Sequence, residues 1–266
     1  MRSRHPFFLR ALTATFAVGC SSDNVTNPTS EATSTSLAHL LPAHDVLRSK
    51  LQDIVGEQNG GLGFEMWATI VDRNGKVVDV VFSGETRTDQ WPGSRVISAQ
   101  KANTANAFSL DGFALSSANL YAAVQPGGSL FGLQESNPVD PKVAYAGKAA
   151  DFGTIKDPMI GKRIGGINVF GGGLALYAAN GKLLGGLGLS GDTSCSDHIK
   201  AWKLRHALNL DNVPGGVAPS NTDNIIYQDG TLDGFEHPTC LDLDGQGDSE
   251  QIGNDLPTTD PVGPDE

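Results

Sequence analysis

The run Lys101-Ala102-Asn103-Thr104-Ala105-Asn106-Ala107-Phe108 decides the fold of this chain. It lies inside a helical pattern over residues 93–110, in which small alanines allow close approach to a sheet. Two later stretches belong with it, the glycine run Gly171-Gly172-Gly173-Leu174 and the strand-like Leu183-Leu184-Gly185-Gly186-Leu187-Gly188-Leu189-Ser190-Gly191. The three stretches predict a helix packed on a sheet, followed by a tight glycine turn and further strands.

Upstream of this helix, the chain has one helical pattern and one hairpin. Residues 43–58 carry apolar side chains at helical spacing and stop at Asn59-Gly60-Gly61. Residues 64–71 and 76–82 are β-branched and aromatic runs on either side of Asn74-Gly75, the strongest short signal for a hairpin. They predict two antiparallel strands.

Downstream, the pattern predicts a short helix at 116–124, a segment without clear period at 126–161, and then more strands. Three strands are expected at 164–170, 174–178 and 182–189, and a closing helix at 194–208. The order of these elements predicts an α/β (α+β) fold, with a five-stranded antiparallel sheet and helices on its faces.

These stretches resemble the GlcG/HbpS family of haem-binding-type domains. In that family a helix reading K-A-x-T-A-x-x-F precedes a glycine-rich turn, a strand, an I-G-V-S-G segment and a last helix with an early Asp. The resemblance spans roughly residues 43–208, and we place the domain at residues 37–208. It implies a profilin-like fold, a three-layer sandwich. It also implies that the domain binds haem and forms homo-oligomers. It also implies that Lys101, Thr104 and Asp197 line or support the region between helix and sheet. The family's connection is shorter, so residues 126–161 are interpreted as an insertion.

The N-terminus predicts export. Residues 1–20 combine three arginines with an apolar stretch that ends at Val18-Gly19-Cys20. We expect a bacterial lipoprotein in which acylated Cys20 anchors the domain to the membrane, in the periplasm or at the cell surface. The alternative is an ordinary secreted protein in which Cys20 is incidental. Residues 21–36 are polar and predict a disordered tether.

The charge of the chain argues against nucleic-acid partners. The sequence holds 30 acidic and 19 basic residues, a formal net charge of −11, and cleavage of the signal would remove three arginines and no acid. A surface this acidic repels phosphate backbones. Residues 209–240 predict a loop-rich extension, and the tail 241–266, with eight acids and no Lys or Arg, predicts disorder.

The last two cysteines, Cys195 and Cys240, allow two interpretations. An even pair in an oxidising compartment predicts a disulfide. However, Cys195-Ser196-Asp197-His198 and His237-Pro238-Thr239-Cys240 have the same Cys/His spacing, and four such ligands can bind zinc. The disulfide is the preferred interpretation, and the metal site stays open.

The resemblance implies haem binding as the function, and because no CxxCH motif occurs the haem would be held without covalent attachment. The axial ligand must come from His, Met, Tyr or Cys in an apolar slot. His44, at the start of the first helix, and His198, at the start of the last, are the candidates, with His44 first. Lys101 would meet a haem propionate or another carboxylate.

Haem handling or redox sensing is the expected role. The alternative is a non-catalytic homo-oligomeric assembly module, with the insertion covering an interface. An enzyme of small organic acid metabolism is a third possibility, but no hydrolase or transferase motif supports it.

Overall fold

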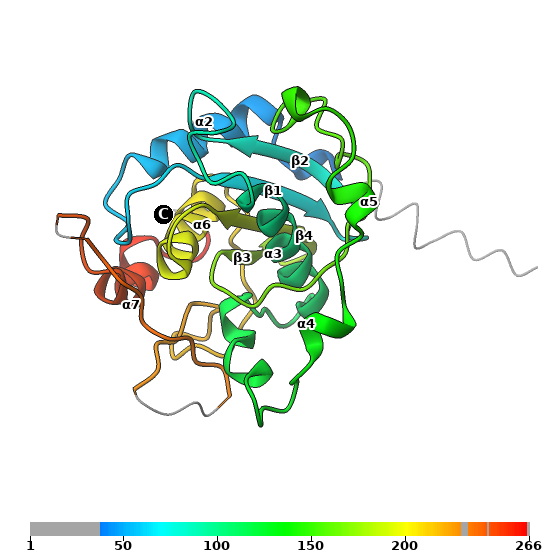
Figure 1. The fold of residues 1–266 in the computed structure, drawn as a ribbon. Helices are drawn as coiled ribbons and strands as arrows, with labels where there is room; N and C mark the ends of the chain where they lie inside the picture. The colour runs from blue at the N-terminus through cyan, green and yellow to red at the C-terminus, as the bar shows by residue number, and fades with distance from the viewer. Residues whose placement is uncertain (1–37, 230–233, 244, 265–266) are drawn as a thin grey trace, which may run out of the picture.

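The computed structural model describes residues 38–229, 234–243 and 245–264. The predicted signal, tether and lipidation residue Cys20 lie outside these residues. Within the described residues, the structure contains one antiparallel sheet in the order β2-β1-β4-β3 (Figure 1). The strands are β1 (Trp67–Asp72), β2 (Val77–Phe82), β3 (Gly173–Tyr177) and β4 (Leu183–Ser190).

The hairpin predicted at Asn74-Gly75 forms, and β1 pairs with β2 across it. A second Asn-Gly turn, Asn180-Gly181, joins β3 to β4 in the same way. β4 then pairs with β1, with Trp67 opposite Ser190 and Asp72 opposite Gly185, and this pairing joins the two hairpins into one sheet.

The sheet has four strands in the described chain, so the prediction of five is wrong. Residues 164–170 lie against helix α3 (Ser94–Phe108) instead of joining the ladder. Side chains of that helix bind the backbone of this segment: Asn103 Nδ2 donates to the Gly166 carbonyl (2.8 Å), and Thr104 Oγ1 accepts from Asn168 N–H (2.9 Å). Because these helix side chains bind backbone groups that a partner strand would otherwise pair, the segment does not need the sheet.

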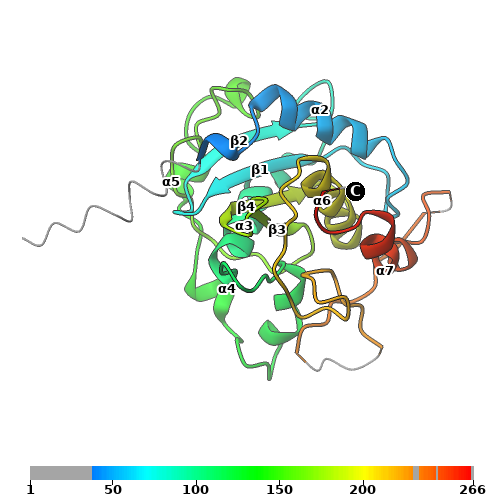
Figure 2. The ribbon, with the colours of Figure 1, turned by 180° about the vertical axis from the view of Figure 1, so that it is seen from behind.

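Helices cover both faces of the sheet, which gives three layers. Helix α3 (Ser94–Phe108) packs on one face, while α2 (His44–Val55) and α6 (Ser194–Ala207) cover the other (Figures 1 and 2). The α2 and α6 side buries an aliphatic core from strands and helices together, which includes Leu51, Ile70 and Ile199. The predicted helices at 43–58, 93–110 and 194–208 are therefore confirmed, with shorter bounds.

Glycines in β4 explain how closely α3 lies on the sheet. A Cβ at Gly186 would collide with the Ala102 carbonyl, and one at Gly188 would collide with the Ser98 carbonyl. Larger residues at these two positions would push the helix away, so the glycines and the alanine-rich helix face form a matched pair.

Residues 126–161, predicted to be an insertion and called the insertion below, are folded against α3. It contains α4 (Leu133–Ser136), α5 (Pro141–Ala144) and the turn η4 (Ala149–Asp151). Arg95 of α3 forms a buried ion pair with Asp157 and donates to the Ala144 carbonyl (2.8 Å). The predicted short helix at 116–124 is two 3-10 turns, η2 (Ala118–Leu120) and η3 (Ala122–Val124).

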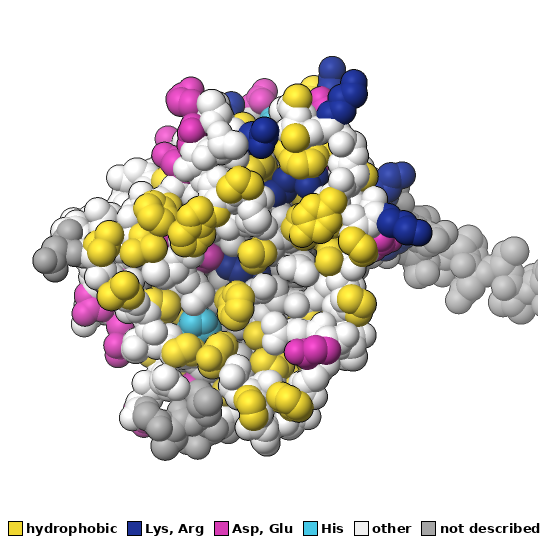
Figure 3. Space-filling view, in the orientation of Figure 1, with side chains coloured by type: hydrophobic (Ala, Val, Ile, Leu, Met, Phe, Trp, Pro, Cys, Tyr) yellow, Lys and Arg dark blue, Asp and Glu magenta, His cyan; other side chains and the backbone are white. Residues whose placement is uncertain are grey.

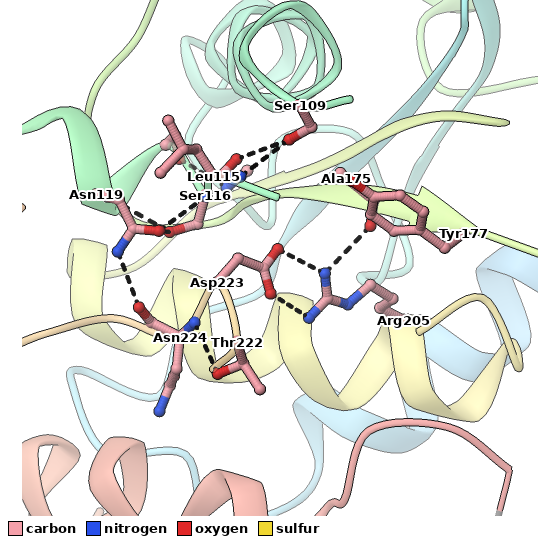
Figure 4. A network of polar contacts seen from close by, with 12 residues as sticks. Ser109, Leu115, Ser116, Asn119, Ala175, Tyr177, Arg205, Thr222, Asp223 and Asn224 are labelled. Carbon is pink, nitrogen blue, oxygen red and sulfur yellow. Dashed lines mark hydrogen bonds and ion pairs between the residues drawn. The ribbon is translucent and has the colours of Figure 1, made fainter. Parts of the chain in front are cut away.

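The C-terminal extension is also anchored by a buried arginine. Arg205 of α6 forms a bidentate pair with Asp223 at 2.7 and 2.8 Å and donates to the Ala175 carbonyl (3.1 Å) (Figure 4). The pair therefore ties the extension to α6 and to β3.

The tail contains an ordered helix, so the prediction of disorder over 241–266 is wrong for its described part. Helix α7 (Ser249–Thr259) begins at Asp248, whose carboxylate accepts from two backbone N–H groups of the first turn. It packs on α6, where Leu256 is fully buried and Trp202 Nε1 donates to the Asp260 carbonyl (2.8 Å). Among the described helices, none has the length and apolar character needed to cross a membrane.

Candidate functional site

Two of the residues carried over from the family resemblance meet at the site. Lys101 projects from α3 and Asp197 from the first turn of α6, and Lys101 Nζ donates to Asp197 Oδ2 at 2.6 Å. Their side chains are 1% and 3% exposed, so the charges are almost fully removed from water. The structure confirms neither a ligand nor a role for the pair, but it places both groups where helix, sheet and glycine turn meet.

The glycine run passes directly over this ion pair. Gly172 has φ +110°, and a Cβ there would lie 3.2 Å from Lys101 Nζ and 3.0 Å from the Asp197 Cβ. Only glycine combines this backbone conformation with such close approach. The run therefore covers the pair with bare backbone.

Thr104, the third carried-over residue, has a structural role. Its Oγ1 donates to the Gln100 carbonyl one turn earlier and accepts from Asn168 N–H at 2.9 Å. It fixes the segment that leads into Phe170 and the glycine run, but it does not contact the Lys101 and Asp197 side chains through any recorded hydrogen bond.

A second buried pair is linked to the first. Lys200 Nζ lies 2.9 Å from Asp192 Oδ2, and the Asp192 N–H donates to Asp197 Oδ1 at 2.9 Å. Burial acts to raise the pKa of Asp192, but the Lys200 charge and backbone N–H donors including Leu62 outweigh it, and the pKa is lowered. For Asp197 burial is the stronger effect, and its pKa is raised despite Lys101. The two carboxyls therefore differ in how firmly they hold a negative charge.

Exposed aromatic side chains lie near the two linked ion pairs, Lys101–Asp197 and Lys200–Asp192. Phe64 and Trp91 pack edge to face with centroids 5.3 Å apart, and both are exposed. The Phe64 N–H donates to Asp192 Oδ2 at 3.0 Å, so the aromatic pair is fixed to the linked carboxylates. Phe170, which is 42% exposed, stands immediately before the glycine run.

The C-terminal segment brings two more exposed apolar side chains close to the segment that carries Phe64. Leu241 and Leu243 are exposed and flank Asp242, whose carboxylate accepts from Gly61 N–H at 2.6 Å. Figure 3 shows one face of the molecule, on which many hydrophobic side chains are exposed between basic, acidic and histidine side chains. We call the exposed side chains of Phe64, Trp91, Phe170, Leu241 and Leu243 the apolar rim. Sequence reasoning did not single these residues out, because the segments that carry them are distant along the chain.

The two predicted axial ligands lie in different places. His198 is fully buried in α6; its Nε2 lies 3.1 Å from Ile225 N and 3.2 Å from Asn224 Oδ1, while Nδ1 has no partner. Burial is the main cause that lowers its pKa to about 3. His44 instead lies at the start of α2, with Nδ1 2.7 Å from Asp79 Oδ1 on β2. The structure therefore brings His198, and not His44, next to the Lys101 and Asp197 pair.

The predicted disulfide between Cys195 and Cys240 is present, with Cα atoms 6.0 Å apart. It pins the extension to the first turn of α6. The four-ligand zinc set is not assembled, since His198 is engaged elsewhere, but the ligand atoms of Cys195, Cys240 and His237 lie within 4.8 Å of one another.

His237 is the least satisfied member of that group. Its Nδ1 lies 2.7 Å from the Pro238 carbonyl, so Nδ1 carries the proton and donates it, and the buried Nε2 is left as a lone pair without a partner. Burial, assisted by the Lys101 charge, lowers the pKa of His237 to about 4. A neutral imidazole with a free Nε2 lone pair is the form that binds metals.

The fold and the site define an α+β sandwich in which a glycine turn covers a buried lysine–carboxylate pair below an apolar rim. A profile of the family described as haem degrading protein HbpS-like matches residues 49–204. This match covers more than half of the chain, so the protein belongs to the HbpS-like family, in agreement with the GlcG/HbpS resemblance of its sequence.

Solved structures give weaker likenesses. The chain is 22% identical to Klebsiella pneumoniae protein ORFY, with 63% of this chain and 90% of that chain covered at a TM-score of 0.42. It is 25% identical to the protein of a PduOC–haem complex (64% and 96% covered, TM-score 0.43) and 16% identical to HbpS (70% and 96% covered, TM-score 0.35). No curated protein sequence matches. Since every TM-score is below 0.5, the family assignment rests on the profile.

Proposed function

We propose that this protein binds haem or a related planar tetrapyrrole without covalent attachment, and that it acts in haem handling or redox sensing. The observation that carries the proposal is membership of the HbpS-like family, since the family is described by haem degradation and its match contains both Lys101 and Asp197. The site geometry adds support of its own.

A tetrapyrrole has an apolar plane and a carboxylate edge, and the site offers a partner for each. The exposed side chains of the apolar rim, among them Phe64, Trp91 and Phe170, can cover the plane. Lys101 is the basic group at the floor, and a propionate would take the place of Asp197 beside it. The raised pKa of Asp197 favours this exchange, because a carboxyl that is easily protonated releases its lysine more readily.

Of the two predicted axial ligands, His198 is the better placed. A Cβ at Gly171 would lie 2.9 Å from His198 Cβ, so the ring starts directly beneath the glycine run. Its imidazole is neutral, as iron ligation requires, and Nδ1 offers a lone pair in the tautomer whose Nε2–H donates to Asn224 Oδ1. His44 remains a candidate for a separate measurement.

The test is a hemin titration of the purified protein, followed by absorbance. We expect saturable one-to-one binding with a shifted Soret band, lost in His198→Ala and kept in His44→Ala. Lys101→Met combined with Asp197→Asn removes both charges without leaving either one unpaired, and should weaken binding about 10-fold. Lys182→Met, which removes an exposed lysine of the β3–β4 hairpin region, should not change it.

A rim variant tests the apolar contribution separately. Phe170→Ala should weaken binding about 10-fold, because a stacking surface is lost, whereas Tyr145→Ala, a 65% exposed aromatic of the insertion, should have no effect. Non-saturating uptake that is equal in all variants would contradict the proposal and favour a colourless assembly module.

Export, anchoring and assembly belong to the same proposal. We infer that acylated Cys20 holds the domain at the membrane outside the cytoplasm and that it works as a homo-oligomer. Wild-type protein should partition into detergent when made in bacteria, and Cys20→Ser should not. Light scattering with and without hemin measures the oligomer, and a monomer under both conditions would remove that part of the proposal.

A further inference from the structure

The disulfide, His237 and their surroundings carry an inference that is independent of haem. We propose that Cys195, Cys240 and His237 form a redox-gated zinc site: closed while the cysteines are a disulfide, and open to one Zn²⁺ when the disulfide is reduced. The site uses the two thiolate sulfurs and His237 Nε2, with a water in the fourth position.

The distances suit such a site. Zinc binds sulfur at about 2.3 Å and imidazole nitrogen at about 2.0 Å in a tetrahedron, so ligand atoms stand roughly 3.5 to 3.8 Å apart. The two sulfurs and one ring nitrogen of His237 already lie within 4.8 Å of one another. Zinc binding requires side-chain rotations that separate the two sulfurs to roughly 3.5 to 3.8 Å and bring Nε2 to about 2.0 Å from the ion.

All three ligands are held by contacts that do not depend on the disulfide. His237 is fixed by main-chain hydrogen bonds, from its own N–H to the Ile226 carbonyl (2.7 Å) and from Gln228 N–H to its carbonyl (3.0 Å). Its ring also packs against Tyr121, with centroids 5.1 Å apart. Reduction therefore leaves the imidazole in position.

The segments that carry the cysteines are anchored as well. Cys195 lies in the first turn of α6, which begins at Thr193, the residue whose side chain accepts from Ser196 N–H. Beyond Cys240, the Asp242 carboxylate accepts from Gly61 N–H and the Leu243 N–H donates to the Gly61 carbonyl (3.0 Å). Both cysteines stay within reach of each other after the bond is broken.

The surroundings favour thiolates, which are the metal-binding form. The first turn of a helix stabilises negative charge, and the Cys195 N–H already points at Cys240 Sγ at 3.2 Å. The buried Nε2 of His237 has no partner in the oxidised form, and a bound ion would satisfy it. Two thiolates and an imidazole are soft or borderline ligands, which suit zinc better than calcium or magnesium.

The chemistry balances in two steps. A thiol reductant transfers two electrons and two protons to the disulfide, giving two thiols and its own disulfide. Zn²⁺ then replaces the two thiol protons, which are released to water. Reoxidation of the two thiolates by a disulfide oxidant would expel the ion.

The experiment uses the full chain with Cys20→Ser, so that only the two site cysteines remain. The protein is reduced with a phosphine without oxygen, and Co²⁺ is added as a spectroscopic probe, followed by competition with Zn²⁺. We expect one Co²⁺ per chain with thiolate-to-cobalt charge-transfer absorption and two protons released as it binds. Zn²⁺ should then displace the Co²⁺ without further proton release. The oxidised protein should show neither.

A matched variant separates ligation from structure. His237→Asn keeps a side-chain N–H for the Pro238 carbonyl but removes the Nε2 ligand, and should weaken Zn²⁺ binding at least about 100-fold. His39→Ala, an exposed histidine, should bind as the parent does. Equal binding by His237→Asn and the parent, or by a Cys195→Ser/Cys240→Ser protein and the parent, would overturn the proposal.

The proposal can also be tested if reduction of the disulfide unfolds the extension. If reduction loosens the extension, Zn²⁺ must restore its near-ultraviolet circular dichroism in the parent and not in His237→Asn. Failure to restore it in the parent would also overturn the proposal.

Discussion

The insertion at 126–161 and the C-terminal extension from residue 209 are attached to the core in the same way but differ in what they leave unsatisfied. Each is anchored by an arginine of a core helix on a buried aspartate, Arg95 on Asp157 and Arg205 on Asp223. Asp157 also accepts from the Gly153 and Met159 N–H groups, and Arg95 stacks on Phe152.

The extension is less complete. Among the described residues, five buried side-chain atoms lack a hydrogen-bond partner, and none of the five lies in the insertion. Four of them belong to α6 or to the extension: those of His198, Arg205, Asp211 and His237. Buried polar groups are normally paired, so unpaired ones need a reason. The insertion is a scaffold, whereas α6 and the extension packed on it carry the buried groups that lack a partner.

Breaking either of the two buried arginine–aspartate pairs should have the largest effect on stability. Asp223→Ala should lower the free energy of unfolding by about 3–5 kcal/mol, because Arg205 is left as a buried, unpaired charge. Asp157→Ala should cost a similar amount through Arg95. Urea denaturation measures both, and hydrogen exchange should locate the loosening in the extension for the first variant and in the insertion for the second.

The control for these variants removes both charges. Arg205→Met with Asp223→Leu should recover most of the stability lost in Asp223→Ala, since an apolar pair replaces an ion pair without an unpaired charge. Asp157→Ala should leave hemin binding unchanged if the insertion is only a scaffold. A loss of hemin binding in that variant would break the comparison between the two regions.

The disulfide gives the next effect. Its cysteines are 45 residues apart, and Cys195→Ser/Cys240→Ser should lower the free energy of unfolding by about 2–4 kcal/mol. The loss should appear in the extension, as faster proteolysis within 209–243, while the insertion keeps its protection. Equal loosening of both regions would mean that the disulfide supports the whole fold and not the extension alone.

The pH dependence of stability sharpens the same contrast. His198 and His237 stay neutral in the fold, with pKa values lowered by burial from 6.5 to about 3 and about 4. Below pH 6.5 the unfolded chain binds more protons than the folded one, so stability is complete above 6.5 and is lost as the pH falls towards these values. Each histidine contributes about 1.4 kcal/mol per pH unit across that window.

Urea denaturation at several pH values checks this expectation. The carboxyl of Asp192, whose pKa is lowered from 3.8, loses its contribution to stability only as the pH falls below its ordinary value, so it does not affect the range from pH 6.5 to about 5. His237→Asn removes one titrating group and should make the pH dependence shallower. A stability that does not change between pH 6.5 and about 5 would show that neither imidazole is held neutral.

The sequence predicted those parts of the molecule that depend on local signals. The hairpin at Asn74-Gly75 and the helices follow from turn chemistry and apolar spacing, and the family resemblance implied that Lys101 and Asp197 share one region. Sequence-based prediction was wrong where the structure of a segment depends on contacts with residues distant in the chain. Helix α7 packs on α6, where Trp202 donates a hydrogen bond to its C-terminal end. Residues 164–170 lie outside the sheet because side chains of α3 bind their backbone.

The candidate site shows the same limit. The spacing of cysteines and histidines indicated a group of four, but no pattern could show that His198 is engaged and that His237 keeps a free lone pair. That difference depends on two backbone groups, Ile225 N–H and the Pro238 carbonyl, which are absent from any residue pattern. The apolar rim is equally non-local.

The smallest expected effect lies at the junction between the insertion and the site. Thr104→Val removes the hydroxyl that accepts from Asn168 N–H and should cost about 1–2 kcal/mol, since that buried N–H loses its partner. Thr104→Ser keeps the hydroxyl and should stay near the parent. Because Asn168 leads into Phe170, the valine variant should also weaken hemin binding slightly, whereas the protection of the insertion against hydrogen exchange should not change. Loosening of the insertion in Thr104→Val would show that scaffold and site are coupled through this single hydrogen bond.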